Sequence, residues 1–300
     1  MLGLSAFFII FYILLFTFYI KNLTFVPQNS ILTMRTVRPK KFLGQHFLTD
    51  LGIASRIADT VDSAPNLPVL EVGPGMGVLT QFLVGKGREL KVVELDDESV
   101  TYLRRTYPAL EDSIIADDFL KMHLQRTFGG RPFLITGNYP YNISSQIFFK
   151  VLDNRDMVPC VTGMIQKEVA DRICATPGSK AYGILSVLIQ TWYSTEYLFT
   201  VEPHVFNPPP KVRSAVIRLT RNDCIDLGCD EELFRRVVKT TFNQRRKTLR
   251  NNLRPLLGEL SISADSIDVD PAMLGLRPEQ LSIPQFVVLT NSIQAASARC

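Results

Sequence analysis

The amino-acid sequence predicts an α/β protein, in which a Rossmann-like domain with a parallel sheet precedes a smaller, mostly helical C-terminal domain. Three observations support this fold class. From Asp50 onward, short apolar runs alternate with segments of helical period, which is typical of a parallel sheet covered by helices. Three closely spaced glycines, Gly73, Gly75 and Gly77, separate one such run from the next helical segment. After Arg221 the alternation stops, and the remaining sequence is mostly helical in character.

The apolar runs give the order of the predicted strands, and the periodic segments between them give the helices. The expected strands are 69–72, 90–95, 113–115, 133–136 and 161–166, and the expected helices are 51–63, 77–86, 97–106 and 144–152. Two late strands, 197–201 and 214–219, are expected on either side of the proline-rich loop EPHVFNPPPKVR. The segment NDCIDLGCD indicates a linker. We therefore expect a main domain at 34–221 and a helical, basic domain at 222–300.

The N-terminal segment 1–33 differs from the rest of the chain. Residues 2–20 carry no charge and are just long enough to span a bilayer, so a membrane anchor is one interpretation. A signal peptide is disfavoured, because no basic segment precedes the apolar run and no clear cleavage site follows it. We favour an upstream extension with translation starting at Met34, because the chemistry-bearing sequence MRTVRPKKFLGQHFLTD follows directly. A membrane-bound protein is not expected.

Composition excludes some classes of site. The 300 residues, with 46% hydrophobic content, suffice for one large domain and a small one. Five cysteines show neither C-x-x-C spacing nor clustering with the three histidines. We therefore expect no metal site and no disulfide framework, and free thiols suit a reducing cytoplasm.

The glycine-rich segment VLEVGPGMGVLT lies between a predicted strand and a predicted helix. Glycines there let the backbone approach a ligand, and the helix N-terminus offers free N–H groups. A tight turn without a ligand is the simpler interpretation, and a dinucleotide site would require G-x-G-x-x-G. Here the third glycine comes one residue early, and Glu71 precedes the turn. This E-x-G-x-G-x-G arrangement resembles the first motif of class I S-adenosylmethionine-dependent methyltransferases, so Gly73 and Gly75 are candidate cofactor-binding residues.

Two acidic residues support the same interpretation. Glu94 ends the second predicted strand, where its carboxylate can accept the ribose hydroxyls of a nucleoside, and Asp118 follows the third, where it can accept from an adenine amine. Either acid alone would be an ordinary solvated residue. Ligands of open α/β sheets bind at the carboxyl ends of the strands, where both acids are expected. We therefore expect S-adenosyl-L-methionine as cofactor.

The segment ITGNYPYNIS follows the fourth predicted strand, at the same edge of the sheet. An adenine amine is a weak nucleophile, and two acceptors on its N–H bonds would direct its lone pair toward a methyl donor. The side-chain oxygen of Asn138 and the carbonyl of Pro140 are candidates for those acceptors. Tyr141 is a candidate for stacking on the base. A proline turn with packed aromatic residues remains the simpler alternative.

Several motifs together resemble the ribosomal RNA adenine dimethyltransferase family. They are KKFLGQHFLTD, VLEVGPGMGVLT, VVELD, GNYPYNIS, QKEVADRI, KAYGILSVL and VFNPPPKVRSAVIRL, in the family's order from about Lys40 to Leu256. The likeness implies methylation of the N6 atoms of two adjacent adenosines near the 3′ end of small-subunit (16S) rRNA. Within the family, the macrolide-resistance methyltransferases of the large subunit are the alternative. The segment SKAYGILSVL and the long basic C-terminal region favour the small-subunit branch.

The resemblance also assigns roles to individual residues. In GQHFL, His46 and Leu48 would cap the cofactor, although the family more often has asparagine at the position of His46. Gly73, Glu94, Asp118 and Asn138 would match the family's remaining cofactor-binding positions, with Asp118 rather than Asp117 as the aspartate. Phe206 would be a second aromatic residue on the target base, although loop packing is its simpler explanation. Tyr139, where the family commonly has leucine, would be the replaceable residue of the motif.

A basic segment indicates how RNA would be held. Residues 235–254 contain eight basic and no acidic residues, a charge of +8 in a chain of net charge +4. Such a run is usually a solvated helix face. Its basic side chains could also neutralise the phosphates of a bound RNA. The predicted RNA-binding residues are Arg245, Arg246, Lys247, Arg250 and Lys211. A second basic cluster, Arg35, Arg38, Lys40 and Lys41, precedes the predicted cofactor cap.

The sequence therefore predicts a cytoplasmic, monomeric enzyme with small-subunit ribosomal RNA and the 30S assembly particle as partners, and with a role in ribosome biogenesis. Three competing functions were considered. A mainly non-catalytic ribosome assembly factor would use the same surface, but the intact Asn-x-Pro-Tyr motif argues against that role alone. An NAD-dependent oxidoreductase is disfavoured by the glycine spacing. A DNA adenine methyltransferase shares the Asn-x-Pro-Tyr type of site and differs in its substrate.

Overall fold

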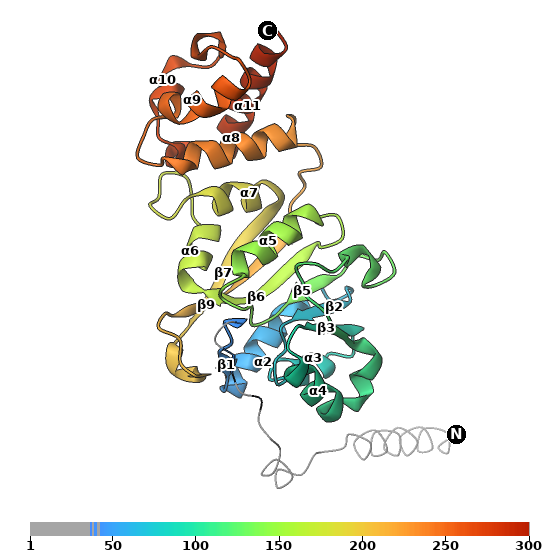
Figure 1. The fold of residues 1–300 in the computed structure, drawn as a ribbon. Coiled ribbons are helices and arrows are strands. Elements are labelled where there is room, and N and C mark those ends of the chain that lie inside the picture. The colour runs from blue at the N-terminus through green and yellow to red at the C-terminus, as the bar shows by residue number, and fades with distance from the viewer. Residues whose placement is uncertain (1–36, 38, 41–42, 300) are drawn as a thin grey trace, which may run out of the picture. The chain divides into compact units, whose positions relative to one another are not determined.

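The computed structural model describes residues 37, 39–40 and 43–299 (Figure 1). The chain divides into two compact units, 1–38 and 39–300, and the second contains the sheet and the helices. The expectation that 1–33 is an extension falls outside the described residues. Within the part that is described, no helix has both the length and the apolar character needed to cross a membrane.

A seven-stranded sheet forms the centre of the unit, in the order β4-β3-β2-β5-β6-β9-β7. Its strands are β2 (Val69–Val72), β3 (Leu90–Glu94), β4 (Ile114–Ala116), β5 (Leu134–Thr136), β6 (Cys160–Gln166), β7 (Tyr193–Val201) and β9 (Ser214–Arg221). Strands β2 to β6 pair in parallel, whereas β9 runs antiparallel to both β6 and β7. Chain order reverses between β2 and β5, so these neighbours mark the switch point where ligands of open α/β sheets bind.

Helices cover both faces of this sheet, as the alternating apolar runs predict (Figure 1). One face packs against α2 (Leu51–Asp59), α3 (Thr80–Val84) and α4 (Asp97–Thr106), and the other packs against α5 (Ser144–Asp153), α6 (Lys167–Ile173) and α7 (Ile184–Trp192). Successive residues of one strand contribute to opposite faces: Val69 packs with α2 to α4, and Leu70 with α5 to α7. Because both faces are covered, all four residues of β2 are buried, which explains why three of them, all except Glu71, are apolar.

Local sequence fixes where several elements begin. Asp50 and Asp96 cap α2 and α4, each accepting a backbone N–H from the first turn of its helix. The helix expected from Gly77 begins only at Thr80, because Gly77 has φ +77° and cannot be helical. A small two-stranded sheet, β1 (Phe47–Leu48) with β8 (Phe206–Asn207), was not predicted. It ties the segment before α2 to the proline-rich loop.

The region after Arg221 contains helices and no strand in its described residues, in agreement with the sequence. Its helices are α8 (Glu231–Asn243), α9 (Leu249–Glu259), α10 (Pro271–Gly275) and α11 (Ile283–Ser297), which lie together beyond α7 in Figure 1. Their buried side chains continue the core of the sheet face that carries α5 to α7. Division of the chain at residue 222 stays a prediction.

Candidate active site

A cavity of about 190 Å³ opens at the carboxyl ends of β2, β3 and β5. Five segments form most of its wall: residues 43–48, hereafter the lid segment, the glycine turn after β2, the end of β3, residues 117–120 after β4, and the turn after β5. Nine predicted residues line it: His46, Leu48, Gly73, Gly75, Glu94, Asp118, Asn138, Pro140 and Tyr141. The structure thus brings the candidate cofactor-binding residues and the Asn-Tyr-Pro-Tyr motif into one cavity.

The glycine turn packs closely against its neighbours, and at Gly75 it leaves no room for a side chain. Gly73 and Gly75 have φ values of +68° and +56°, which favour glycine. A Cβ atom on Gly75 would lie 2.9 Å from Cε1 of Phe47 in the lid segment. One on Gly73 would lie 3.6 Å from the ring of Pro140. The turn therefore packs closely against both the lid segment and the Asn-Tyr-Pro-Tyr motif, and its backbone forms the cavity wall.

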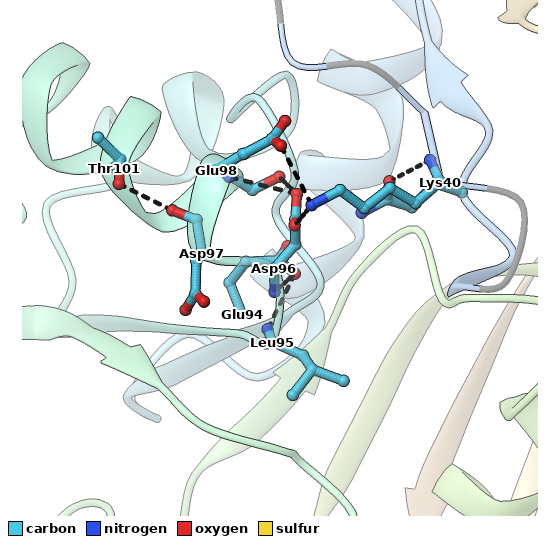
Figure 2. A network of polar contacts seen from close by, with 9 residues as sticks. Lys40, Glu94, Leu95, Asp96, Asp97, Glu98 and Thr101 are labelled. Carbon is cyan, nitrogen blue, oxygen red and sulfur yellow. Dashed lines mark hydrogen bonds and ion pairs between the residues drawn. The ribbon is translucent and has the colours of Figure 1, made fainter.

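Glu94 is fixed by backbone N–H groups on both sides of the cavity floor. Its Oε2 accepts from the N–H of Gly75 at 3.0 Å. Its Oε1 accepts from Leu95 and Asp96 at 2.9 Å each, and these three residues are labelled in Figure 2. Burial raises the pKa of Glu94, and these three hydrogen bonds oppose that rise. The carboxylate therefore holds the glycine turn in place, and its remaining acceptor capacity is available to a ligand hydroxyl.

Glu71 is a second buried carboxyl group, directly before the glycine turn. It is 1% exposed, and its Oε2 accepts a hydrogen bond of 2.7 Å from Thr80 at the start of α3. Burial raises its pKa to about 8, although the hydrogen bond from Thr80 opposes the shift. At neutral pH this group is therefore mostly uncharged in the ligand-free protein.

Asp117 and Asp118, after β4, both line the cavity. Asp118 accepts from the N–H of Leu120 at 2.9 Å and forms an ion pair of 3.6 Å with Lys121. Asp117 accepts from the N–H of Asp118 at 2.7 Å. The preference for Asp118 as the adenine-binding residue remains a prediction.

The Asn-Tyr-Pro-Tyr turn is held from several directions. The side-chain N–H of Asn138 donates to the carbonyl of His46 at 3.1 Å, which leaves the side-chain oxygen as the acceptor. The Pro140 carbonyl accepts from the N–H of Ile143 at 3.2 Å, so one of its two lone pairs is already used. Tyr141 is hydrogen-bonded through its hydroxyl to Ser214 on β9. These contacts fix the direction of each group that was predicted to act on a base.

Tyr139 has a structural position that the sequence did not indicate. Its ring is 1% exposed, and its hydroxyl donates to the Thr162 carbonyl at 2.7 Å. A Cβ atom on Gly163 would lie 2.8 Å from this ring. The tyrosine therefore anchors the motif to β6 from within the core.

The lid segment meets the proline-rich loop as well as the Asn-Tyr-Pro-Tyr turn. Nδ1 of His46 donates to the carbonyl of Pro208 at 2.8 Å, and its ring centroid lies 5.3 Å from that of Tyr141. Leu48 pairs with Phe206 across β1 and β8. Phe206 is only 3% exposed, packs in the core and is not part of the cavity wall. The structure thus does not bring Phe206 to the site, and its predicted contact with a base stays a prediction.

The basic segment is only partly available to phosphates. Its apolar residues Val237, Val238, Leu249 and Leu253 are buried, as expected for the packed side of the helices. Four of its arginines face carboxylates from outside the segment: Arg235 with Asp153, Arg236 with Glu259, Arg245 with Glu279 and Arg250 with Asp265. Arg246, Lys247 and Lys211 are exposed and have no ion pair within the described residues. The exposed residues are therefore the stronger candidates for RNA contacts.

Several contributors to the site were missed by sequence reasoning. Thr80 and Ser214 hold Glu71 and Tyr141, but no motif distinguishes a threonine or serine that binds another side chain. Lys40 was grouped with the RNA-binding cluster, whereas the structure pairs it with Asp96 and Glu98. The rest of that cluster, Arg35, Arg38 and Lys41, lies outside the described residues. The sequence did contain a signal for this ion pair. In the segment VVELDDE, three acidic residues follow Glu94, and such a cluster favours a nearby basic side chain.

The sheet order and the cavity define the class of this protein. Six strands that run in one direction with an antiparallel β9 between β6 and β7, and a glycine turn with acids at the switch point, are the features of a class I S-adenosylmethionine-dependent methyltransferase. Two solved structures share the fold. A dimethyladenosine transferase from Plasmodium falciparum has a TM-score of 0.69 at 22% identity, covering 84% of this chain and 98% of that protein. The 23S rRNA methyltransferase ErmE has a TM-score of 0.59 at 26% identity, covering 83% and 99%.

Sequence comparisons identify the family within this class. The family model described as Ribosomal RNA adenine dimethylase matches residues 37–286. A relative from Bacteroides thetaiotaomicron, named Ribosomal RNA small subunit methyltransferase A, is 69% identical over 263 residues, or 88% of this chain and 97% of that protein. A protein of the same name from Porphyromonas gingivalis is 57% identical over 262 residues, or 87% and 100%. The chain belongs to the ribosomal RNA adenine dimethylase family.

Proposed function

We propose that this protein transfers methyl groups from S-adenosyl-L-methionine to the N6 atoms of two adjacent adenosines near the 3′ end of small-subunit rRNA. The observation that carries the proposal is the single cavity in which Glu94 and the glycine turn meet Asn138, Pro140 and Tyr141. The name of its relatives, small subunit methyltransferase A, supports the choice of RNA.

The cavity fits the proposed cofactor. Glu94 is oriented by three backbone N–H groups and suits ribose hydroxyls. Gly73 and Gly75 present bare backbone where a Cβ atom would collide with the lid segment or narrow the cavity. Carboxyl groups from Glu94 and Asp118 line the space, which suits a ligand with positive charge and no phosphate. When bound, S-adenosylmethionine would supply a methyl group on a sulfonium, whose departure as a neutral thioether drives transfer.

The residues of the chain supply position rather than a strong base. Asn138, with its N–H held by His46, offers its side-chain oxygen to an adenine amine. Pro140 offers the second lone pair of its carbonyl. Two acceptors on the N–H bonds would localise the nitrogen lone pair, and positioning of this kind accounts for much of the rate enhancement in such reactions. Tyr141, whose hydroxyl is hydrogen-bonded to Ser214, would stack on the target base.

RNA is expected to contact the helical region and the proline-rich loop. We assign residues 222–300 to RNA binding, with Arg245, Arg246, Lys247 and Arg250 as the contacts, and Lys211 of the proline-rich loop as a further contact. Arg246, Lys247 and Lys211 are exposed, so their charge can neutralise phosphates. The target adenosine must leave its stack to reach the cavity, as in other base-modifying enzymes. A monomer acting on 30S assembly particles in the cytoplasm, with a role in their biogenesis, completes the proposal.

The test is transfer of labelled methyl groups from S-adenosylmethionine to unmethylated small subunits, with large subunits and duplex DNA as alternative substrates. We expect label in the small subunit with the unaltered chain and on the order of a hundredfold less with Asn138→Ala. Undiminished transfer by Asn138→Ala would overturn the role of the asparagine. Label in large subunits or in DNA would favour the macrolide-resistance or DNA-methyltransferase alternatives, and binding without transfer would favour an assembly factor.

A further inference from the structure

Lys40 forms an ion pair with the acidic turn that follows β3. Its Nζ donates a hydrogen bond to Oδ1 of Asp96 and lies 3.5 Å from Oε1 of Glu98 (Figure 2). The Asp96 side chain is 2% exposed, whereas that of Lys40 is 27% exposed. A nearly buried carboxylate is thus neutralised by a lysine from a distant part of the chain.

Asp96 connects this lysine to Glu94. Its backbone N–H donates to Oε1 of Glu94 at 2.9 Å, and its second carboxylate oxygen accepts from the hydroxyl of Ser99 at 2.8 Å. Burial would raise the pKa of Asp96, but the hydrogen bonds from Lys40 and Ser99 hold that pKa below its ordinary value. The residue is therefore charged at neutral pH, and loss of Lys40 would leave a buried charge without its cation.

Lys40 also connects to the lid segment. Its carbonyl accepts from the N–H of Leu43 at 3.0 Å, and its own N–H donates to the side chain of Gln45 at 2.9 Å. The far end of the lid segment is held by Asn138, through the carbonyl of His46, and by the pairing of Leu48. The lid segment is therefore attached beside β5 at one end and, through Lys40, beside β3 at the other.

We propose that Lys40 is a positioning residue, whose ion pair with Asp96 keeps the lid segment closed over the cavity and slows release of the cofactor. This inference rests on the proposed function, because it assumes that S-adenosylmethionine occupies the cavity. Opening the lid segment on the β3 side would separate Lys40 from a carboxylate that cannot turn to solvent. Each opening therefore costs the free energy of separating Lys40 from a nearly buried carboxylate. Breaking a fully exposed ion pair would cost much less.

The test compares four forms of the full chain. Lys40→Met removes the charge and keeps the length of the side chain, and Lys40→Arg keeps the charge. Lys86→Met is a matched control, because Lys86 pairs with Asp59 and Asp62 at 2.6 Å each and lies outside the cavity wall. Two quantities are measured: the dissociation rate of S-adenosylmethionine, and hydrogen exchange of the backbone amides of 43–48 in the cofactor-free protein.

We expect Lys40→Met to speed dissociation about threefold to tenfold and to speed exchange in the lid segment, as loss of a partly exposed ion pair would. The KM for the cofactor should rise more than kcat falls, and Lys40→Arg should restore most of the slow release. Lys86→Met should match the unaltered chain in both measurements.

Unchanged dissociation and unchanged exchange in Lys40→Met would overturn the proposal. Equal changes in Lys40→Met and Lys86→Met would overturn it too, because they would reflect general destabilisation. Failure of the unaltered chain to bind S-adenosylmethionine would instead refute the proposed function, and with it the role of Lys40.

Discussion

The side-chain N–H of Asn138 donates to the backbone carbonyl of His46 at 3.1 Å, and this bond joins the turn after β5 to the lid segment. It does two things at once. It turns the asparagine oxygen into the acceptor of the motif, and it holds one end of the segment that covers the cavity. Under the proposed function, substrate positioning and cofactor enclosure would both depend on this amide group.

Asn138→Asp separates these effects from simple loss of volume. A carboxylate keeps the acceptor but has no N–H for the carbonyl of His46, so two oxygens would face each other. We expect single-turnover methyl transfer at saturating cofactor to fall on the order of a hundredfold. Asn138→Gln keeps the amide one methylene further out and should lose activity as well. Wild-type turnover in Asn138→Asp would show that this hydrogen bond is not needed.

Glu71 predicts a pH dependence of stability in the cofactor-free protein. Its pKa is about 8 in the folded chain against 4.5 ordinarily, so its contribution is fully present below pH 4.5 and is lost as the pH rises toward 8. The free energy of unfolding should fall by up to about 1.4 kcal/mol per pH unit in this window. Urea unfolding of Glu71→Gln should show a flatter dependence, with the exposed Glu232→Gln as control. Identical slopes in Glu71→Gln and the unaltered chain would contradict the account.

Gly75→Ala tests the close contact between the glycine turn and the lid segment. Gly75 and Gly87 have similar φ values, +56° and +63°, but only Gly75 has a neighbour in the way of a Cβ atom, 2.9 Å from Phe47. Alanine at either position should cost about 1–2 kcal/mol of backbone strain in thermal unfolding. Cofactor affinity, measured by calorimetry, should weaken in Gly75→Ala alone. Equal affinity in both variants would mean that the turn does not shape the cavity.

The exposed basic residues predict a salt dependence of RNA binding. Arg246→Gln and Lys247→Gln should each reduce the slope of log K against log salt concentration by about 1, because each removes one phosphate contact. Arg236→Gln should have a smaller effect, since Arg236 already pairs with Glu259 at 2.8 Å. The measurement is binding of small-subunit RNA fragments over a range of salt. An equal effect of all three substitutions would contradict the distinction between paired and free arginines.

Much of the sheet and the cavity could be predicted from the sequence, because both depend on local signals. The sequence predicts strand β2 and helix α4 with their observed bounds, since three apolar residues before the glycine turn mark the strand and an acidic N-cap marks the helix. The glycines and acids at strand ends met as expected, because parallel strands place their carboxyl ends at one edge.

The remainder depends on contacts between distant segments. Strands β1 and β8 have two residues each, which is too short to show the alternation of apolar and polar residues that predicts a strand. The same contact places Phe206 in the core beside Leu48 rather than at the cavity. Arg235 and Arg236 meet Asp153 and Glu259, which lie outside the segment in which their charge was counted. Such pairings depend on tertiary packing, so they cannot be predicted from the local sequence.

The central claim is dimethylation of two adjacent adenosines, and the most direct measurement is the number and position of methyl groups added to unmethylated small subunits. Labelled S-adenosylmethionine gives the number, and mass spectrometry of nuclease fragments gives the position. We predict about four methyl groups per subunit, since each exocyclic amine has two N–H bonds to lose, all on two neighbouring adenosines near the 3′ end. Methyl groups on a single adenosine of the large subunit, or none on either, would contradict the account.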